Sequence, residues 1–474
     1  MLKKTQINKK LILITLVALS LNLVSCGGGG GGGSDQQTSP AVNSTPVTPV
    51  AEKIIVVGAG LAGLTAARDM KVAGFDVTVL EAREHIGGRT YTDQSTGIPL
   101  EMGAHWILGI NQSATYELAV EAGVAVTAPF TWNSQGYVFD GSPFTITAED
   151  IASFNQEVST GCQINYEAQS STSFEEMAET KYENGNFPYL NRREFDYLIS
   201  TYIEISYAGD VSLMSASQCW EGSSYYGADA TIPGGYSQLS SYLSEGLDIQ
   251  LNTVVTAVTY NNQGVTITTS KGVYSADRAV MTVPVGVLRS GDIQFSPTLP
   301  QSKLDAINLI GSGTINKTWM IFPHTFWDTN TVLFRYMSDP KGHFSEWYSF
   351  DNLETYSVLM AFNGGSEAIE MESLTDEEIT AEAMTILRTM FGADIPEPVN
   401  VIQTRWNSDP FAKGAYSFLR AGAVAVRDRN NLAENVIERL FFAGEATSVA
   451  NYATTEGAIR SGRKAAIDVL NYAN

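Results

Sequence analysis

Residues 54–57 form an unbroken β-branched run, Ile-Ile-Val-Val, with no polar position inside it. Such a run is typical of a short strand that is buried on both faces of a sheet. Residues 61–70 are expected to form a helix, and residues 76–80 a second strand. The order strand, helix, strand predicts a βαβ unit at the start of the folded chain.

Three glycines join the first strand to the helix with the spacing GxGxxG. The first glycine allows a tight turn, the second lets the backbone approach a pyrophosphate, and the third permits close packing of helix and strand. The N-terminus of the helix also favours the negative charge of a phosphate. We therefore expect a dinucleotide to bind at Gly58, Ala59, Gly60, Leu61, Ala62 and Gly63.

An acidic residue ends the second strand. Glu81 lies 18 residues after Gly63, and a carboxylate that binds a ribose hydroxyl is expected roughly 20 residues on. The alternative is a βαβ unit that belongs to an ordinary core. The full order of strand, glycine turn, helix, strand and acid favours a dinucleotide site, but it does not separate NAD from FAD.

The C-terminal part of the chain repeats this kind of pattern. Residues 440–443 are expected to form a strand, followed by a glycine turn with Glu445 and a helix that starts near Thr455. A strand, glycine turn and helix so late in the chain suggest a second contact with the same cofactor.

Residues 315–321 alternate as a strand, with Lys317 on the same face as Trp319.

The N-terminal residues are not expected to belong to the fold. Residues 1–25 have a basic start and then an apolar stretch of 14 residues, which is short for a membrane span and typical of a signal peptide. The stretch ends in LVSC, which resembles the bacterial lipobox, so Cys26 is expected to carry lipid and anchor an exported protein to the cell envelope membrane. The alternative is an ordinary signal peptide that is cleaved elsewhere. Residues 26–52, which are rich in Gly, Ser, Thr and Pro, are expected to form a flexible tether.

Charge and cysteine content narrow the possible functions. The formal net charge of −22 disfavours nucleic-acid binding and slightly favours a cationic substrate, although it also fits an acidic protein that is kept soluble by its charge. Cys162 and Cys219 either pair in an oxidising compartment or remain two buried thiols. No pattern indicates a metal site, and none indicates an oligomeric state.

Several further segments carry a family resemblance that runs from about residue 53 to residue 470. They are EAREHIGGRT, LEMGAHWILGIN, TIPGGYSQL, AVMTVPVGVL, GSGTINKTWMIF, RWNSDPFAKGAYSF and RLFFAGEATSVANYATTEGAIRSGRKAA. In this order they resemble the flavin-containing amine oxidases, a family that includes monoamine oxidases, polyamine oxidases and the lysine-specific histone demethylase. The GAHWI portion is closest to the polyamine oxidases.

The resemblance implies FAD as cofactor, bound non-covalently because FAKGAYSF lacks the cysteine to which monoamine oxidases attach their flavin. Besides the glycine turn, the residues expected to bind FAD are Glu81, Ala82, Arg83, Gly88, Arg89, Met102, Gly103, Ala104, His105, Trp106, Val255, Trp406, Gly444, Glu445, Thr454 and Thr455.

Two residues are candidates for catalysis. By resemblance, Lys317 holds a water beside flavin N5; the alternative is a lysine whose stem packs at a strand end while its amine reaches water. His105 is expected to contact substrate beneath the flavin, or else to be a structural histidine beside Trp106.

Three further positions concern the substrate. The family often has an aromatic residue at the position of Asn451, whereas Tyr452 stands one residue later. Either the loop shifts so that Tyr452 serves, or the pocket lacks one wall. Glu204 lies where several polyamine oxidases have a glutamate for a distant ammonium, but a structural helix glutamate is an equal alternative.

We therefore expect an α/β protein in which a Rossmann-like FAD-binding domain (53–130, 231–300 and 405–474) interleaves with a mixed-sheet and helical substrate domain (131–230 and 301–404). The expected reaction is oxidation of a primary or secondary amine, with a polyamine-like substrate favoured, by hydride transfer to the flavin and reduction of O₂ to H₂O₂. The alternatives are an L-amino-acid oxidase of the same superfamily and a tethered flavoprotein without activity.

Overall fold

The computed structural model describes residues 51–127, 133–220, 222, 225–350 and 357–473. The expected signal peptide, Cys26 and nearly all of the expected tether lie outside these residues, so the interpretation of the N-terminal region stays a prediction. Within the described ranges, no helix combines the length and the apolar character needed to cross a membrane.

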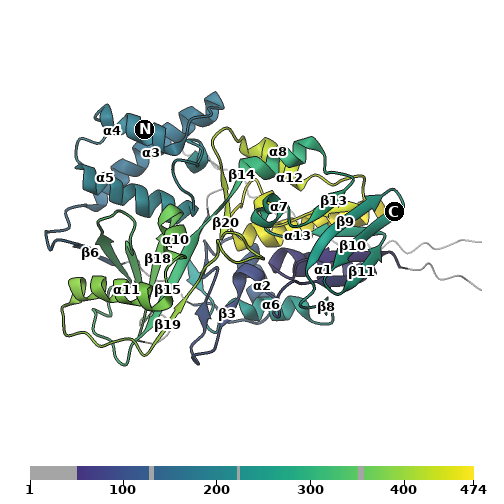
Figure 1. The fold of residues 1–474 in the computed structure, drawn as a ribbon, viewed down its shortest axis with the longest axis horizontal. Coiled ribbons are helices and arrows are strands. Elements are labelled where there is room, and N and C mark those ends of the chain that lie inside the picture. Colours follow the sequence, from purple (N-terminus) through teal and green to yellow (C-terminus); the bar gives the residue numbers. More distant parts are fainter. Residues whose placement is uncertain (1–50, 128–132, 221, 223–224, 351–356, 474) are drawn as a thin grey trace, which may run out of the picture. The chain divides into compact units, whose positions relative to one another are not determined.

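A five-stranded parallel sheet contains the predicted βαβ unit. Figure 1 labels its edge strand β8 (Asp248–Gln250) and the helix of the unit, α1 (Leu61–Val72). Its strands, in spatial order, are β21 (Leu440–Phe442), β12 (Arg278–Met281), β1 (Lys53–Val57), β2 (Asp76–Leu80) and β8 (Asp248–Gln250). The predicted strand at 54–57 lies within β1, at the centre of this sheet, and is buried from Ile54 to Val57. The late strand predicted at 440–443 pairs with β12 as β21.

The two faces of β1 pack into different cores, which is why its sequence has no polar position. Ile54 and Val56 pack with residues of α1 (Leu61–Val72), α6 (Ser237–Ser244) and α13 (Thr455–Ala473). Ile55 and Val57 pack against a second sheet and its covering helices. That sheet is β11 (Gly272–Ala276), β10 (Gly264–Thr269), β9 (Val255–Asn261) and β13 (Gln294–Ser296), and the helices are α7 (Val285–Ser290), α8 (Gln301–Leu309) and α12 (Ala425–Ala433).

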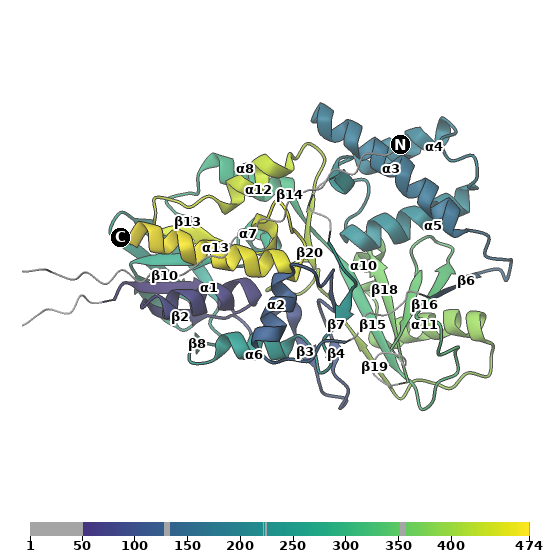
Figure 2. The same cartoon turned by 180° about the vertical axis from the view of Figure 1, so that it is seen from behind.

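A six-stranded mixed sheet forms the second large layer (Figure 2). In spatial order it consists of β19 (Asn400–Gln403), β15 (Ile315–Ile321), β18 (Val358–Gly364), β17 (Glu346–Ser349), β16 (Leu333–Met337) and β6 (Ser134–Val138). One face, with Met320 and Leu359, packs on α11 (Asp376–Phe391), and α10 (Gly365–Met371) follows β18. The other face, with Trp319 and Phe362, packs on Met102 and Trp406.

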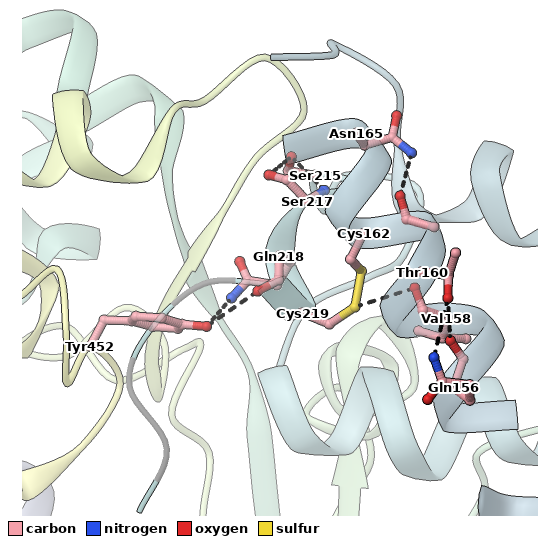
Figure 3. Close-up of a disulfide and its surroundings, with 11 residues drawn as sticks. Gln156, Val158, Thr160, Cys162, Asn165, Ser215, Ser217, Gln218, Cys219 and Tyr452 are labelled. Carbon is pink, nitrogen blue, oxygen red and sulfur yellow. Dashed lines mark hydrogen bonds between the residues drawn. A yellow bond between two sulfur atoms is a disulfide. The ribbon is translucent and has the colours of Figure 1, made fainter. Parts of the chain in front are cut away.

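A helical cluster lies beside this sheet. It contains α3 (Ala148–Ala168), α4 (Phe174–Glu183), α5 (Arg192–Ile199) and the π-helical turn η2 (Ser200–Ile205). Cys162 of α3 and Cys219 of the short turn η3 (Gln218–Trp220) form a disulfide, with Cα atoms 5.8 Å apart (Figure 3). The structure thus selects the paired arrangement of the two that the sequence left open.

The remaining elements are short and connect the layers. They are η1 (Gly88–Thr90), β3 (Thr92–Asp93), β4 (Leu100–Glu101), β5 (Trp106–Ile107), α2 (Ala114–Glu121), β7 (Ala230–Thr231), β14 (Ile310–Gly313), β20 (Tyr416–Leu419) and η4 (Glu445–Thr447). Several of them carry the residues of the site described next.

Candidate active site

One cavity of about 800 Å³ runs from the glycine turn after β1 to the inner face of the six-stranded sheet. This volume is within the range of roughly 300–1,000 Å³ that is usual for small-molecule sites. Its walls come from segments far apart in sequence, because the parallel sheet and the mixed sheet both contribute residues to it.

Most of the residues singled out from the sequence line this cavity. They are Gly58, Gly60, Leu61, Ala62, Glu81, Ala82, Arg83, Gly88, Arg89, Met102, Gly103, Ala104, His105, Trp106, Val255, Lys317, Trp406, Gly444, Glu445, Tyr452, Thr454 and Thr455. Of the residues expected to bind cofactor or substrate, Ala59, Gly63 and Glu204 do not line it. Ala59 and Gly63 support the glycine turn, whereas Glu204 lies elsewhere.

The glycine turn needs its glycines for different reasons. Gly58 has a φ of +106°, a backbone conformation that other residues rarely adopt. A Cβ at Gly63 would lie 2.0 Å from the Gly58 carbonyl oxygen, so only glycine permits this packing of α1 on β1. At Gly60 the nearest atom to such a Cβ is the Gly87 oxygen at 3.9 Å, so a side chain there would take up cavity space rather than clash with protein.

Glu81 lies at the same end of the cavity and is buried. Its Oε2 accepts a hydrogen bond from the Ala59 N–H at 2.7 Å, and its Oε1 accepts one from the Arg83 N–H at 2.9 Å. An ionised carboxylate has about four acceptor positions, so each oxygen can accept a further hydrogen bond from a ligand hydroxyl. The Arg83 guanidinium forms a bidentate pair with Asp409, at 2.8 Å for both contacts.

A second ion pair lies farther along the cavity. Arg89 Nη1 lies 2.9 Å from Glu445 Oε1, and the second Glu445 oxygen accepts a hydrogen bond from the Ser417 hydroxyl at 2.7 Å. Burial raises the pKa of Glu445, but Arg89, Ser417 and Arg429 together lower it below its ordinary value. Glu445 is therefore ionised at neutral pH and fixes the position of Arg89.

Lys317 points from β15 into the cavity with its side chain almost fully buried. As predicted, Lys317 and Trp319 lie on the same face of β15. Both side chains donate to the Glu101 carbonyl oxygen, and Trp319 packs on Met102. Lys317 Nζ donates to the carbonyl oxygens of Glu101 (2.9 Å) and Gly103 (2.6 Å). Burial lowers the pKa of Lys317 to about 7, against the opposing charge of Glu101.

The protonation state of Lys317 determines what it offers to a ligand. A neutral amine has two N–H donors and one lone pair. When both donors bind the two carbonyls, the lone pair can accept a hydrogen bond from a water in the cavity. The alternative of a lysine that reaches bulk water does not fit the geometry, because the amine is buried.

His105 also lines the cavity and is 5% exposed. Its ring packs 4.7 Å from those of both Trp106 and Phe350. Burial, and then the charge of Lys317, hold the pKa of His105 well below its ordinary value, so the imidazole is neutral. Neither ring nitrogen has a hydrogen-bond partner among the described residues. A neutral imidazole has one donor and one acceptor, and both are available to a ligand.

Of the two residues considered for the aromatic wall, Tyr452 lines the cavity and Asn451 does not. The loop before α13 is therefore arranged so that the tyrosine stands in the wall despite its shift by one position. Its hydroxyl accepts a hydrogen bond from Gln218 Nε2 at 2.8 Å (Figure 3).

Glu204 does not line the cavity, so its contact with a distant ammonium of the substrate stays a prediction. It lies in the π-helical turn η2, is buried, and has a carboxylate oxygen 3.6 Å from Lys341 Nζ. Burial raises its pKa although Lys341 acts in the opposite direction. The observed contact corresponds to the structural alternative, in which Glu204 pairs with a lysine of the protein.

Phe362 and Tyr416 are among the aromatic wall residues that the sequence reasoning missed. Phe362 pairs directly with Lys317 across β18 and β15, and strand alternation in 358–364 could have indicated its direction. Tyr416 stands in the FAKGAYSF segment, and its hydroxyl donates to the carbonyl oxygens of Ile205 (3.1 Å) and Ser206 (3.2 Å). Phe362 lies beside Lys317 and packs against Trp106, and Tyr416 and Tyr452 line the same cavity.

Comparison with known proteins identifies relatives over nearly the whole described chain. A family profile described as flavin containing amine oxidoreductase matches residues 61–470. Polyamine oxidase 4 of Oryza sativa subsp. japonica is 32% identical over 433 residues, which cover 87% of each chain. Lysine-specific histone demethylase 1 homolog 2 of the same plant is 32% identical over 449 residues, covering 89% of this chain and 57% of the demethylase. This chain thus spans little more than half the length of such demethylase relatives.

Solved structures with the same fold are also found. Putrescine oxidase bound to putrescine superposes with a TM-score of 0.75 at 22% identity, covering 89% of this chain and 99% of the other. At this identity the similarity establishes the common α/β fold.

Proposed function

The chain belongs to the family of flavin-containing amine oxidoreductases, and from this premise we propose that it oxidises a small polyamine-like amine with O₂ as electron acceptor. The enzyme class, a flavin oxidoreductase that acts on amines, and the cofactor, FAD, follow from the family itself. The choice of substrate is our proposal. The observation that carries it is a cavity that connects a dinucleotide turn to an aromatic compartment around Lys317.

The residues present fit FAD. The space in front of Gly60 admits a pyrophosphate close to the backbone, and the N-terminus of α1 faces the same region. Glu81 keeps acceptor capacity for a ribose hydroxyl. Farther along the cavity, Gly444 and the Glu445–Arg89 pair line the wall and would face the flavin portion.

We propose that FAD binds without a covalent link. Two of the chain's three cysteines, Cys162 and Cys219, are joined to each other in a disulfide. The third, Cys26, belongs to the segment expected to act as a signal and lipidation site. Acid precipitation of the purified protein should therefore release flavin into solution, whereas flavin that stays with the pellet would contradict non-covalent binding.

FAD held by these residues would supply the redox chemistry, namely removal of a hydride from the carbon next to the amine nitrogen to leave an imine, and return of the two electrons to O₂ as H₂O₂. Lys317 holds a water in the cavity through its lone pair. His105 offers one donor and one acceptor to the substrate. The aromatic walls exclude bulk water and disfavour the ammonium form of the amine, and the neutral amine is the form that can be oxidised.

The alternative of an L-amino-acid oxidase is less compatible with this wall. Its substrate carboxylate needs a free basic side chain, and the arginine and lysine side chains that line the cavity in the described residues are Arg83, Arg89 and Lys317. The two arginines are ion-paired with Asp409 and Glu445, and Lys317 donates to two carbonyls.

Measurement of H₂O₂ release with each substrate distinguishes a polyamine-like substrate from an L-amino acid. The purified protein should produce H₂O₂ with polyamines and diamines, and much less with L-amino acids or simple monoamines. Turnover confined to L-amino acids would replace the proposed substrate class. A peptide with a methylated lysine belongs in the same panel because of the demethylase relatives.

We also propose that the protein is exported and anchored to the cell envelope membrane by lipid on Cys26, on the outer-membrane or periplasmic side. The basic start, the apolar stretch and LVSC support this, and the Cys162–Cys219 disulfide is compatible with an oxidising compartment. Cys26→Ser should abolish incorporation of a labelled fatty acid and release the protein from the membrane fraction. Unchanged labelling would refute the anchor.

A further inference from the structure

Tyr452 is held in the cavity wall by a glutamine from a distant part of the chain. Gln218 Nε2 donates to the Tyr452 hydroxyl at 2.8 Å, and that hydroxyl donates to the Gln218 carbonyl oxygen at 3.4 Å (Figure 3). Gln218 is fully buried and does not itself line the cavity. Its link to the site therefore passes through the tyrosine.

The ring of Tyr452 is held on its face as well. The Arg429 guanidinium carbon lies 4.1 Å from the ring centroid, a distance at which a cation and an aromatic ring attract each other. Arg429 is fully buried, and its Nη1 donates to the Ser417 hydroxyl (3.0 Å) and to the Ala446 carbonyl oxygen (2.9 Å). Arg429 holds the face of the ring, while Gln218 holds the hydroxyl.

Gln218 is itself fixed from two sides. Its Oε1 accepts a hydrogen bond from the Leu419 N–H of β20 at 2.6 Å. The next residue, Cys219, is joined by the disulfide to Cys162 of α3 (Figure 3). The glutamine thus presents its amide to Tyr452 from a short turn that is tied both to a strand and to a helix.

We propose that Gln218 is a positioning residue for the amine site: it fixes the direction of Tyr452 in the cavity wall and thereby sets the fit of the substrate. This inference rests on the proposed function, in which the compartment beside Lys317 receives the amine. A loosened Tyr452 should weaken substrate binding more than it slows the chemistry, because Tyr452 forms part of the cavity wall and is not proposed to exchange a hydride or a proton with the substrate.

The test is a double-mutant cycle on the FAD-loaded protein, with Gln218→Met and Tyr452→Phe alone and together, and with a polyamine as substrate. Gln218→Met should raise KM about threefold or more, the scale of one lost hydrogen bond, with kcat and flavin content nearly unchanged. In the Tyr452→Phe background the same change should raise KM no further, since the hydroxyl through which Gln218 acts is gone. Equal KM effects in both backgrounds, or no effect in either, would overturn the inference.

Gln218→Glu tests the amide donor at nearly constant side-chain shape. A glutamate keeps an acceptor for the Leu419 N–H but cannot donate to the Tyr452 hydroxyl, so KM should stay raised as in Gln218→Met. Melting temperatures measured for the same cycle need no turnover, and they should be non-additive if the two side chains are coupled. A purely structural glutamine would lower the melting temperature equally in both backgrounds. A wild-type protein that oxidises no amine would instead refute the proposed function, whatever the thermal cycle gives.

Discussion

Two buried lysines of this protein have similarly lowered pKa values, but one lies in the cavity wall and the other lies between two helices. Burial lowers the pKa of Lys317 and of Lys303 to about 7, and each Nζ donates to two backbone carbonyl oxygens. Lys317 lines the cavity, whereas Lys303 packs between α8 and α12. A comparison of the two separates the role of an amine in the site from the general effect of burying one.

Lys317→Met keeps the length and apolar stem of the side chain and removes its amine. Flavin should still bind, because Gly60 and Glu81 are unchanged, but reduction by amine or reoxidation by O₂ should slow at least tenfold, which is about 1.4 kcal/mol of barrier. Rapid mixing measures both half-reactions. Lys303→Met is the matched control and should leave both rates near wild type; normal rates in Lys317→Met would show that its amine is not needed.

His105 can be tested by separating its nitrogens from its ring. His105→Phe preserves packing against Trp106 and Phe350, whereas His105→Ala also removes the ring. If the imidazole contacts substrate, both variants should reduce their flavin more slowly with amine while retaining nearly full FAD content. A His105→Phe protein with wild-type rates would mean that the residue serves packing alone.

The position of a site residue could be predicted from the sequence where it depends on neighbouring residues of the same element. It could not be predicted where it depends on a contact with a distant part of the chain. Lys317 could be placed on the inner face of its strand from alternation, and Glu81 from its position after β2. Glu204 could not be judged, because its pairing with Lys341 depends on the folded chain. Gln218 gave no signal at all, since its contacts with Tyr452 and Leu419 join residues about 200 positions or more apart.

At the scale of elements, two positions of the glycine turn require glycine for different reasons. Gly60→Ala should leave the ligand-free protein folded, because the added Cβ meets no protein atom closer than 3.9 Å, but it should sharply lower FAD content by crowding the pyrophosphate. Gly63→Ala should lower both stability and FAD content, because its Cβ would lie 2.0 Å from the Gly58 oxygen. Flavin-to-protein ratios and melting curves distinguish them; a Gly60→Ala protein with full flavin would contradict this account.

The disulfide should contribute strongly to stability, because Cys162 and Cys219 are 57 residues apart. Closing a loop of this length in the unfolded chain is worth about 4 kcal/mol in the chain-entropy model. The Cys162→Ala, Cys219→Ala double variant should lose a free energy of unfolding on that scale in denaturant titrations. A reducing agent should destabilise wild type and leave the double variant unaffected; a wild type insensitive to reduction would count against the bond.

Most elements around the cofactor site could be predicted because their patterns are local. The strand predicted at 54–57 is β1 (Lys53–Val57), the helix at 61–70 is α1 (Leu61–Val72), and the helix near Thr455 is α13. The disulfide could not be predicted, because two cysteines in one chain do not reveal how close the fold brings them. The π-helical turn that carries Glu204 also has no marker in its sequence.

At the scale of the whole molecule, the site exists because two sheets supply opposite ends of one cavity. The parallel sheet contributes the glycine turn and Glu81, and the mixed sheet contributes Lys317 and Phe362. The α/β class and the amine oxidase family followed from ordered segments along the sequence, and the fold and the comparisons confirm both. The substrate did not follow, because the wall that selects it is assembled from residues of several separate segments.

The most direct test of the central claim, that this cavity uses bound FAD to oxidise a small polyamine-like amine, is anaerobic titration of the purified yellow protein. Polyamines and diamines should bleach the visible flavin absorbance with about one equivalent of amine per flavin, and admission of O₂ should restore the colour and release H₂O₂. L-amino acids should leave the spectrum unchanged. A flavin that binds but is reduced by no amine in the panel, or by L-amino acids alone, would contradict the account.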